Sequence, residues 1–232
     1  MGRTKSEETC YMCDAPKTSM EHVPPICLFP AKKDLTDADR EKGVDYRKEP
    51  IKVPSCKKHN SDKSKIDELM LIYFSACKSA NEVGKSHISN KLARIMKRPQ
   101  KNKLFSELFM NSSPILISEE GQIKQSISLS VESTTFYDHL ECMANGLYFD
   151  YFKKRTTGLT KVWVVSGVRN ADGEANDEAK AVKRLFESDF EKVKSNGHNQ
   201  DVFHYKMISN GSDSILLMTF YGAIEFIACF DC

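Results

Sequence analysis

Two short motifs of cysteine and histidine constrain this chain more than any other feature of its sequence. Cys10 and Cys13 form a C-x2-C pair, and Cys56 and His59 form a C-x2-H pair after 42 intervening residues. The N-terminus has no apolar stretch typical of a secretory signal, so we expect free thiols rather than disulfides. Three thiolates and one imidazole form a complete tetrahedral ligand set for structural Zn²⁺. The spacing therefore predicts one zinc site that joins two distant parts of the N-terminal region.

A further cysteine pair lies near the C-terminus. Cys229 and Cys232 also have C-x2-C spacing, but they continue an apolar run over 223–230 and have no second pair nearby. Two cysteines alone do not complete a structural zinc site. We therefore interpret Cys229 as a small buried side chain of a strand, with a second metal site as the alternative.

Length and composition place the chain among ordinary globular proteins. It has 232 residues, of which 40% are hydrophobic and 28% are charged, a balance that excludes wholesale disorder. No window approaches the roughly 18 consecutive apolar residues of a membrane-spanning helix. We therefore expect a soluble, cytoplasmic protein with a sizeable core and no membrane partner.

The charge is distributed unevenly along the chain. Residues 1–110 carry 22 Lys and Arg against 15 Asp and Glu, a net charge of +7. Residues 111–232 carry 12 against 17, a net charge of −5. A basic N-terminal half indicates an anionic partner, most commonly nucleic acid. A basic surface without a partner explains the charge equally well, and the charge alone does not distinguish the two.

Two helices are predicted after the second ligand pair. From Ser64 onward, apolar side chains recur at helical spacing up to Cys77. A second helix is predicted over 88–97 and ends before Pro99. Its cations are expected to contact nucleic-acid phosphates, with a solvated helix face as the alternative. The basic side chains of this face are Lys91, Arg94 and Arg98.

Residues beyond 112 alternate between strand and helix patterns. Asn176 is expected to cap one of the helices. The pattern predicts an α+β fold with an antiparallel sheet. The expected elements are a hairpin over 115–131, helices over 136–151 and 176–193, and strands over 162–168, 202–208, 215–220 and 223–230.

These patterns divide the chain into three regions. We expect a zinc-stapled finger over 1–75 and a basic helical connector over 76–112. The remaining residues, 113–232, form the predicted α+β domain, to which the sequence assigns no role.

The residues between and behind the ligand pairs include a candidate base and candidate oxygen ligands for a cation, the two kinds of group that phosphodiester hydrolysis needs. Glu21 and His22 precede two prolines, Asn60 directly follows the last predicted zinc ligand, and Lys63 comes three residues later. A neutral imidazole with an ordinary pKa near 6.5 suits a general base, so His22 is the candidate that activates water. Mg²⁺ or Mn²⁺ prefers oxygen ligands, which Glu21 and Asn60 supply. Lys63 is expected to hold a backbone phosphate.

The order of these residues resembles the HNH endonucleases, also known as His-Me finger or ββα-metal nucleases. The resemblance covers about residues 8–70, less than a third of the chain. It implies a zinc-bound hairpin and helix around a catalytic divalent metal ion, and a metal-dependent endonuclease. DNA is the expected substrate, with RNA as the open alternative. The matching positions are Cys10, Cys13, Glu21, His22, Pro25, Cys56, His59, Asn60 and Lys63.

Three positions depart from the common HNH pattern. Glu21 stands where the family usually has Asp, and His59 stands where the fourth zinc ligand is often Cys. His59 preserves the ligand set. Ile51 occupies a position at which the family often has asparagine, which removes a group expected to orient the finger.

Two other functions stay open. The first is a non-catalytic zinc module that binds nucleic acid or a partner protein. Glu21 and His22 in an exposed turn, with Asn60 as a helix cap, would fit that module. The second is a nuclease subunit of a bacterial antiviral defence or mobile-element system, in which the C-terminal domain docks a partner protein or forms a homo-oligomer.

Overall fold

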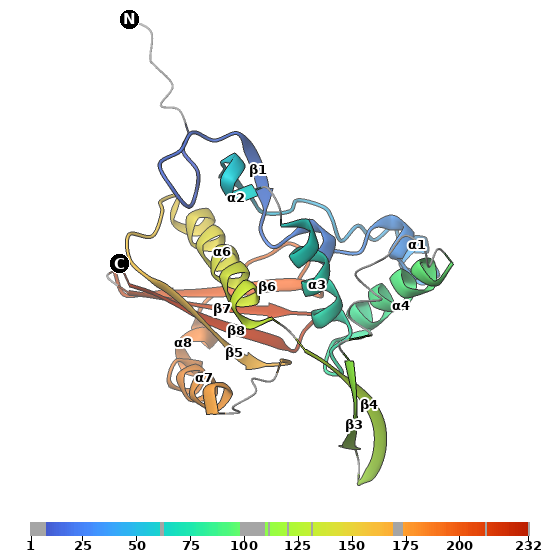
Figure 1. Cartoon of the computed structure of the whole chain (residues 1–232). Helices are drawn as coiled ribbons and strands as arrows, with labels where there is room; N and C mark the ends of the chain where they lie inside the picture. The colour runs from blue at the N-terminus through green and yellow to red at the C-terminus, as the bar shows by residue number, and fades with distance from the viewer. Residues whose placement is uncertain are drawn as a thin grey trace, which may run out of the picture.

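Helices and antiparallel strands make up the chain, which confirms the predicted α+β class. A computed structural model describes residues 8–60, 63–97, 110, 112–119, 121–130, 132–168, 174–211 and 213–231. A small N-terminal hairpin and its helices lie beside a four-stranded C-terminal sheet, and a second hairpin projects away from both (Figure 1).

The C-terminal sheet has the strand order β5-β8-β7-β6, and every neighbouring pair is antiparallel. In β6 the alternate residues Phe203, Tyr205 and Met207 are buried, because successive side chains of a strand point to opposite faces. Cys229 lies in β8, as the apolar run predicts, but its side chain is half-buried rather than fully buried, and Cys232 lies outside the described residues. The strands are β5 (Thr160–Ser166), β6 (Phe203–Ser209), β7 (Asp213–Phe220) and β8 (Ile224–Asp231).

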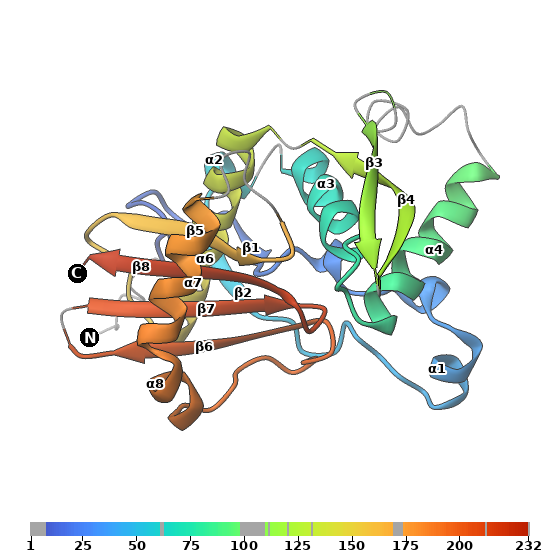
Figure 2. The same cartoon turned by 90° about the horizontal axis from the view of Figure 1, so that it is seen from below.

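Helices cover both faces of this sheet. Helix α6 (Ser133–Phe152) packs on one face, and α7 (Glu174–Leu185) and α8 (Glu187–Lys192) pack on the other (Figure 2). The side chain of Glu132 caps α6 by accepting the N–H groups of Thr134 and Thr135. None of the described helices has the length and hydrophobicity needed to cross a bilayer.

The prediction that Asn176 caps a helix is wrong. Helix α7 begins two residues earlier, at Glu174, and the buried Asn176 side chain points toward the sheet. Its amide nitrogen donates to the carbonyl oxygens of Val164 and Val168, each at 3.1 Å. Asn176 therefore fastens α7 to the end of β5, a tertiary role that sequence spacing does not encode.

The N-terminal region is built around an antiparallel pair of short strands, β1 (Ser19–His22) and β2 (Lys52–Ser55). The charged segment that connects them contains the short helix α1 (Asp37–Glu41), and Thr36 caps it by accepting the N–H of Asp39. Two 3-10 turns, η1 (Ile26–Leu28) and η2 (Lys32–Asp34), precede α1. The chain then continues through α2 (Lys57–Asn60) and α3 (Ser64–Ser75), the second of which confirms the predicted helix.

Helix α4 (Glu82–Met96) is longer than the predicted helix over 88–97. It begins six residues earlier because the Asn81 side chain accepts the N–H of Gly84 at 3.1 Å, a typical N-cap contact. The sequence also predicts a short helix near 104–110, and of that range only residue 110 lies within the described residues. The predicted hairpin is confirmed as β3 (Ser112–Glu119) and β4 (Gln122–Leu129).

Side chains from both ends of the chain share one hydrophobic core. Leu28 and Val53 from the N-terminal region lie in the same buried cluster as Leu140 of α6 and Phe226 of β8. Gly146 of α6 lies so close to Val23, the residue after β1, that a Cβ atom there would approach the Val23 side chain to 2.8 Å. These contacts cross the boundaries predicted at 75 and 112, so the division of the chain into three regions remains a prediction.

A buried tyrosine joins the N-terminal region to the C-terminal sheet. Tyr221, in the turn between β7 and β8, donates its hydroxyl hydrogen to the Leu28 carbonyl oxygen at 2.5 Å. The same hydroxyl lies 3.2 Å from Nδ1 of the buried His87 in α4. The Tyr221 carbonyl oxygen accepts the N–H of Asn81 at 2.9 Å. One side chain and its backbone therefore contact η1, α4 and the loop that precedes α4.

Candidate functional site

The four predicted zinc ligands converge at one end of the β1–β2 hairpin. Nδ1 of His59 lies 3.4 Å from Sγ of Cys10, 3.5 Å from Sγ of Cys13 and 3.4 Å from Sγ of Cys56. The Sγ atoms of Cys13 and Cys56 are 3.8 Å apart, and all four ligand atoms lie within 4.8 Å of one another. This Cys3His group could hold a metal ion.

The separations within the Cys3His group match those of a tetrahedral zinc site. Zn–S bonds of about 2.3 Å and Zn–N bonds of about 2.0–2.1 Å place neighbouring sulfurs about 3.8 Å apart and sulfur about 3.5 Å from nitrogen. The thiolate-rich donor set also favours zinc over hard cations such as Mg²⁺. The residues present therefore fit Zn²⁺.

Backbone hydrogen bonds hold the two ligand pairs against each other. The N–H of Tyr11 donates to the carbonyl oxygen of Pro54 in β2 at 2.8 Å, which places the first pair beside the second. The first pair folds back through a bond from the N–H of Cys10 to the carbonyl oxygen of Ala15 at 2.9 Å. His59 returns toward Cys56 because its N–H donates to the Cys56 carbonyl oxygen at 3.1 Å, within the first turn of α2.

Glu21 lies on the inward face of β1, where it forms an ion pair with Lys63. Nζ of Lys63 is 2.7 Å from Oε1 of Glu21 and also donates to the Tyr11 hydroxyl at 3.4 Å. Within the part of the chain that the structure describes, Oε2 of Glu21 is buried and has no hydrogen-bond partner. Burial and then the nearby Glu21 carboxylate raise the pKa of Tyr11, so its phenol stays protonated.

Asn60, the last residue of α2, reaches the same face of β1. Its Nδ2 atom donates to Oγ of Ser19 at 2.7 Å. Ser19 and Glu21 are two residues apart in a strand, so their side chains leave β1 on one side. Lys63, not Asn60, occupies the cap position of α3, so Asn60 does not cap that helix.

His22 is the last residue of β1, and strand alternation directs its side chain away from the face that carries Glu21. It is paired across the hairpin with Lys52 of β2. The imidazole is half-buried, and burial together with the charges of Lys52 and Arg47 lowers the pKa of His22. The neutral, proton-accepting form of His22 therefore persists to lower pH than for an ordinary histidine.

The structure thus separates the predicted catalytic residues into two groups. Glu21, Asn60 and Lys63 lie together on the inward side of β1, whereas His22 faces Lys52 and Arg47. Lys52 and Arg47 were not among the predicted site residues. Only the register of β1 against β2, set across a connection that includes α1, places Lys52 opposite His22. Arg47 belongs to that connection, and its charge also acts on the imidazole.

The basic face predicted on α4 is engaged within the molecule. Nζ of Lys91 lies 2.8 Å from Oε1 of Glu68 in α3. Arg94 forms an ion pair with the buried Asp34 and donates to the Lys33 carbonyl oxygen at 3.2 Å. Arg98 lies outside the described residues. Lys91 and Arg94 therefore fasten α4 to α3 and η2, and a role for them in nucleic-acid binding stays a prediction.

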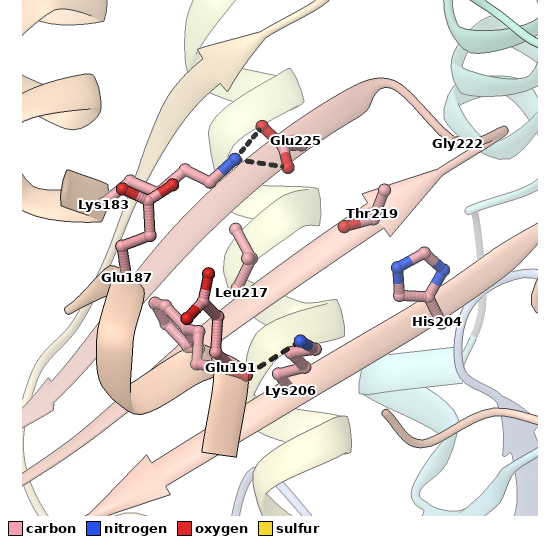
Figure 3. A pocket seen from close by; sticks show the side chains of 10 residues that line it. Lys183, Glu187, Glu191, His204, Lys206, Leu217, Thr219, Gly222 and Glu225 are labelled. Carbon is pink, nitrogen blue, oxygen red and sulfur yellow. Dashed lines mark hydrogen bonds and ion pairs between the residues drawn. The ribbon is translucent and has the colours of Figure 1, made fainter. Parts of the chain in front are cut away.

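A polar pocket of about 250 Å³ lies on the outer face of the C-terminal sheet, beside α7 and α8 (Figure 3). Nζ of Lys183 lies 2.7 Å from both carboxylate oxygens of Glu225. Lys206 donates to the carbonyl oxygen of Phe190 at 2.8 Å. Both lysines are thus held by acceptors of the protein itself, and we assign no ligand to this pocket.

Comparison of the chain with protein-family models, curated proteins and solved structures found no match. The resemblance to HNH endonucleases therefore rests on the motif residues and on the positions that they occupy in the fold.

Proposed function

We propose that the chain is a zinc-stapled, metal-dependent endonuclease of the HNH type. One observation carries the proposal: the Cys3His group brackets the β1–β2 hairpin that presents Glu21 and His22. Asn60, next to the last ligand, bonds to the same hairpin through Ser19. A hairpin and a following helix joined by zinc is the arrangement that the motif resemblance implies.

In this proposal His22 acts as the general base. Its lowered pKa keeps the imidazole neutral at physiological pH, so Nδ1 or Nε2 can accept a proton from water. Lys52, opposite His22 in the hairpin, and Arg47, whose charge acts on the same imidazole, provide positive charge where a phosphate would approach. These two cations, rather than the face of α4, are then the first contacts of the nucleic-acid backbone.

Glu21 and Asn60 are the residues that would hold one Mg²⁺ or Mn²⁺. The Oε2 atom of Glu21, which is buried and has no hydrogen-bond partner among the described residues, fits this role, because a hard cation takes carboxylate and amide oxygens as ligands. When bound, a divalent cation neutralises negative charge on a phosphodiester and on its leaving group. Lys63 holds the other oxygen of Glu21 and thereby fixes the orientation of the carboxylate.

The motif resemblance favours DNA as the substrate over RNA. The test is cleavage of supercoiled plasmid by zinc-loaded protein with Mg²⁺ or Mn²⁺, compared between wild type and His22→Ala. Loss of a general base should reduce the single-turnover rate by about 10²- to 10⁴-fold while zinc content and DNA binding are retained. His204→Ala, which changes a histidine of the outer pocket in Figure 3, is the matched control and should cut at the wild-type rate.

A second function, a non-catalytic zinc module that binds nucleic acid or a partner protein, is favoured by the ion pair of Glu21. Lys63 already neutralises this carboxylate, and His22 leaves the opposite side of the strand. If nuclease-free wild-type protein binds DNA or RNA but cuts neither with any divalent ion, in the presence of any required partner, the non-catalytic module replaces the nuclease.

A further inference from the structure

Arg47 lies in the connection between β1 and β2, and its guanidinium is held through one nitrogen. Nε donates to the carbonyl oxygen of Phe29 at 2.9 Å, and the backbone N–H of Arg47 donates to Oδ1 of Asp45 at 3.0 Å. The side chain is half-buried. A guanidinium also carries N–H donors on its two terminal nitrogens, Nη1 and Nη2, hereafter the fork. The bond to Phe29 therefore restrains the group and leaves the fork available.

The fork of Arg47 has no hydrogen-bond or ion-pair partner among the residues that the structure describes. The other half-buried arginines within those residues are Arg94 and Arg155, and they form ion pairs with Asp34 and Asp14. A partly buried cation without a counter-charge is unfavourable, because it loses hydration and gains no acceptor in exchange. Arg47 is thus a half-buried arginine whose fork is open to an anion from outside the chain.

Contacts from the C-terminal region hold the backbone beside Arg47. Nδ2 of Asn199 donates to the carbonyl oxygen of Lys48 at 3.1 Å. Nδ1 of His198 lies 3.2 Å from Oε2 of Glu49, the next residue along the chain. A side chain that is already restrained loses less conformational freedom when it binds a ligand. The fork is therefore oriented before a ligand arrives.

Two lysines near Arg47 in the sequence add uncompensated positive charge. Lys48 and Lys52 are exposed, and neither has an acidic partner within the part of the chain that the structure describes. Burial and then the charges of Lys52 and Arg47 lower the pKa of His22, and no described carboxylate acts in the opposite direction. An anion that approaches the fork therefore does not have to displace an existing ion pair.

We propose that the fork of Arg47 binds one phosphate of a nucleic-acid backbone, with Nη1 and Nη2 donating to its two non-bridging oxygens. A planar guanidinium matches two phosphate oxygens in this way, whereas a lysine ammonium supplies a point charge. The choice of nucleic acid rests on the proposed function, and an acidic peptide, whose carboxylates also have two oxygens, is the alternative that the experiment separates. Arg47 thereby fixes the position of the backbone, a role beyond attraction by positive charge.

The test is the affinity of the zinc-loaded full chain for a short fluorescent DNA duplex, measured by anisotropy without added Mg²⁺ or Mn²⁺ so that the duplex stays intact. Arg47→Gln should weaken binding roughly 10- to 100-fold and reduce the slope of log affinity against log salt concentration by about 1. Arg47→Lys keeps the charge but not the fork, so it should restore the salt slope and leave most of the affinity loss. An Arg47→Lys variant with wild-type affinity overturns the proposal, because charge alone would then suffice.

The matched control is Arg40→Gln, which removes an equal charge from the same connection. The guanidinium of Arg40 is exposed and already paired with Asp37 at 2.7 Å, so this change should alter the affinity less than about 3-fold. Zinc content and circular dichroism establish that each variant is folded. If Arg47→Gln does not fold, the Nε–H resonance of Arg47 in wild type should shift with inorganic phosphate and not with acetate at equal ionic strength. An equal shift with acetate overturns the preference for phosphate.

Two further results overturn the proposal: wild type that binds the duplex no more tightly than Arg47→Gln, or an Arg47→Gln variant that keeps its DNA affinity and loses binding of a glutamate-rich peptide. The outcome is separable from cleavage, because binding is measured without the catalytic cation. A chain that holds DNA through Arg47 but does not cut it retains the phosphate fork and loses the proposed nuclease. A chain that cuts DNA and binds it equally well without the fork retains the nuclease and loses the role of Arg47.

Discussion

Replacement of Lys63 by methionine tests whether the ion pair behind β1 is structural. Nζ of Lys63 lies 2.7 Å from Oε1 of Glu21, and the two side chains are only 17% and 12% exposed. Methionine retains an unbranched apolar chain but removes the charge, so the Glu21 carboxylate would remain buried without its partner. We expect Lys63→Met to destabilise the protein.

The magnitude follows from the burial of the pair. At 2.7 Å and an effective dielectric constant of about 20, the gross attraction is about 6 kcal/mol, opposed by several kcal/mol of desolvation for each ion. Removal of one partner from a buried pair costs about 3–5 kcal/mol, and the small residual exposure of these side chains lowers the expectation to about 2–4 kcal/mol. Adding Glu21→Gln, which removes the second charge, should recover at least half of this loss.

Urea unfolding of zinc-loaded protein at neutral pH measures this loss. Fluorescence of the single tryptophan, Trp163 in β5, and far-ultraviolet circular dichroism should give coincident transitions before a free energy is assigned. The matched control is Lys85→Met, which breaks an exposed pair with Glu82 in α4. That change should cost less than about 0.5 kcal/mol.

A Lys63→Met variant as stable as Lys85→Met would refute the reasoning, because the pair would then contribute no more than a surface contact. If that variant also lost DNA affinity, Lys63 would instead serve the substrate phosphate, as the sequence motif predicts. Stability and binding measured on one preparation therefore distinguish the two roles of a single lysine.

Three further predictions concern the metal and two histidines. Purified protein should contain about one Zn²⁺ per chain, and Cys56→Ala should lose the metal and the amide-exchange protection around the Cys3His group; soluble, protected protein without zinc would contradict this. Because the pKa of His22 is lowered, kcat/KM for cleavage should fall only below the ordinary histidine range, and Lys52→Gln should move that acidic limb to higher pH. Burial lowers the pKa of His87 to about 4, so its contribution to the free energy of unfolding is complete above pH 6.5 and about 3 kcal/mol of stability is lost as the pH falls toward 4. In urea titrations at several pH values, His87→Gln should flatten the dependence of unfolding free energy on pH. A pH dependence equal to that of wild type would refute this prediction.

Local sequence patterns predicted the elements whose formation depends on near neighbours. A long amphipathic pattern of apolar residues predicted α6, and the alternation of Phe203, Tyr205 and Met207 with other residues predicted β6. The Cys3His group was also predictable, because C-x2-C and C-x2-H spacings encode two knuckles that only a shared metal would use. In each case the information lies within a few residues.

Contacts between segments that are distant in the sequence could not be predicted from local sequence patterns. The basic spacing on α4 suggested a free cationic face, but the acidic partners of Lys91 and Arg94 lie on other elements and become neighbours only in the folded chain. Likewise, adjacency of Glu21 and His22 suggested one site, whereas a strand directs neighbouring side chains to opposite sides. The division of a motif between two faces is thus a property of β1, not of its residue types.

The contacts of Tyr221 bear on how this chain could be re-engineered. A finger cut out near residue 75 would leave the Leu28 carbonyl oxygen without the donor that Tyr221 supplies from the far end of the chain. It would also remove α6, whose Gly146 lies so close to Val23, the residue after β1, that an added methyl group would not fit. The zinc-binding segment therefore cannot be transferred to another protein by itself, because its packing depends on the C-terminal sheet. A chimaera should retain residues 8–231 and place its junctions outside that range.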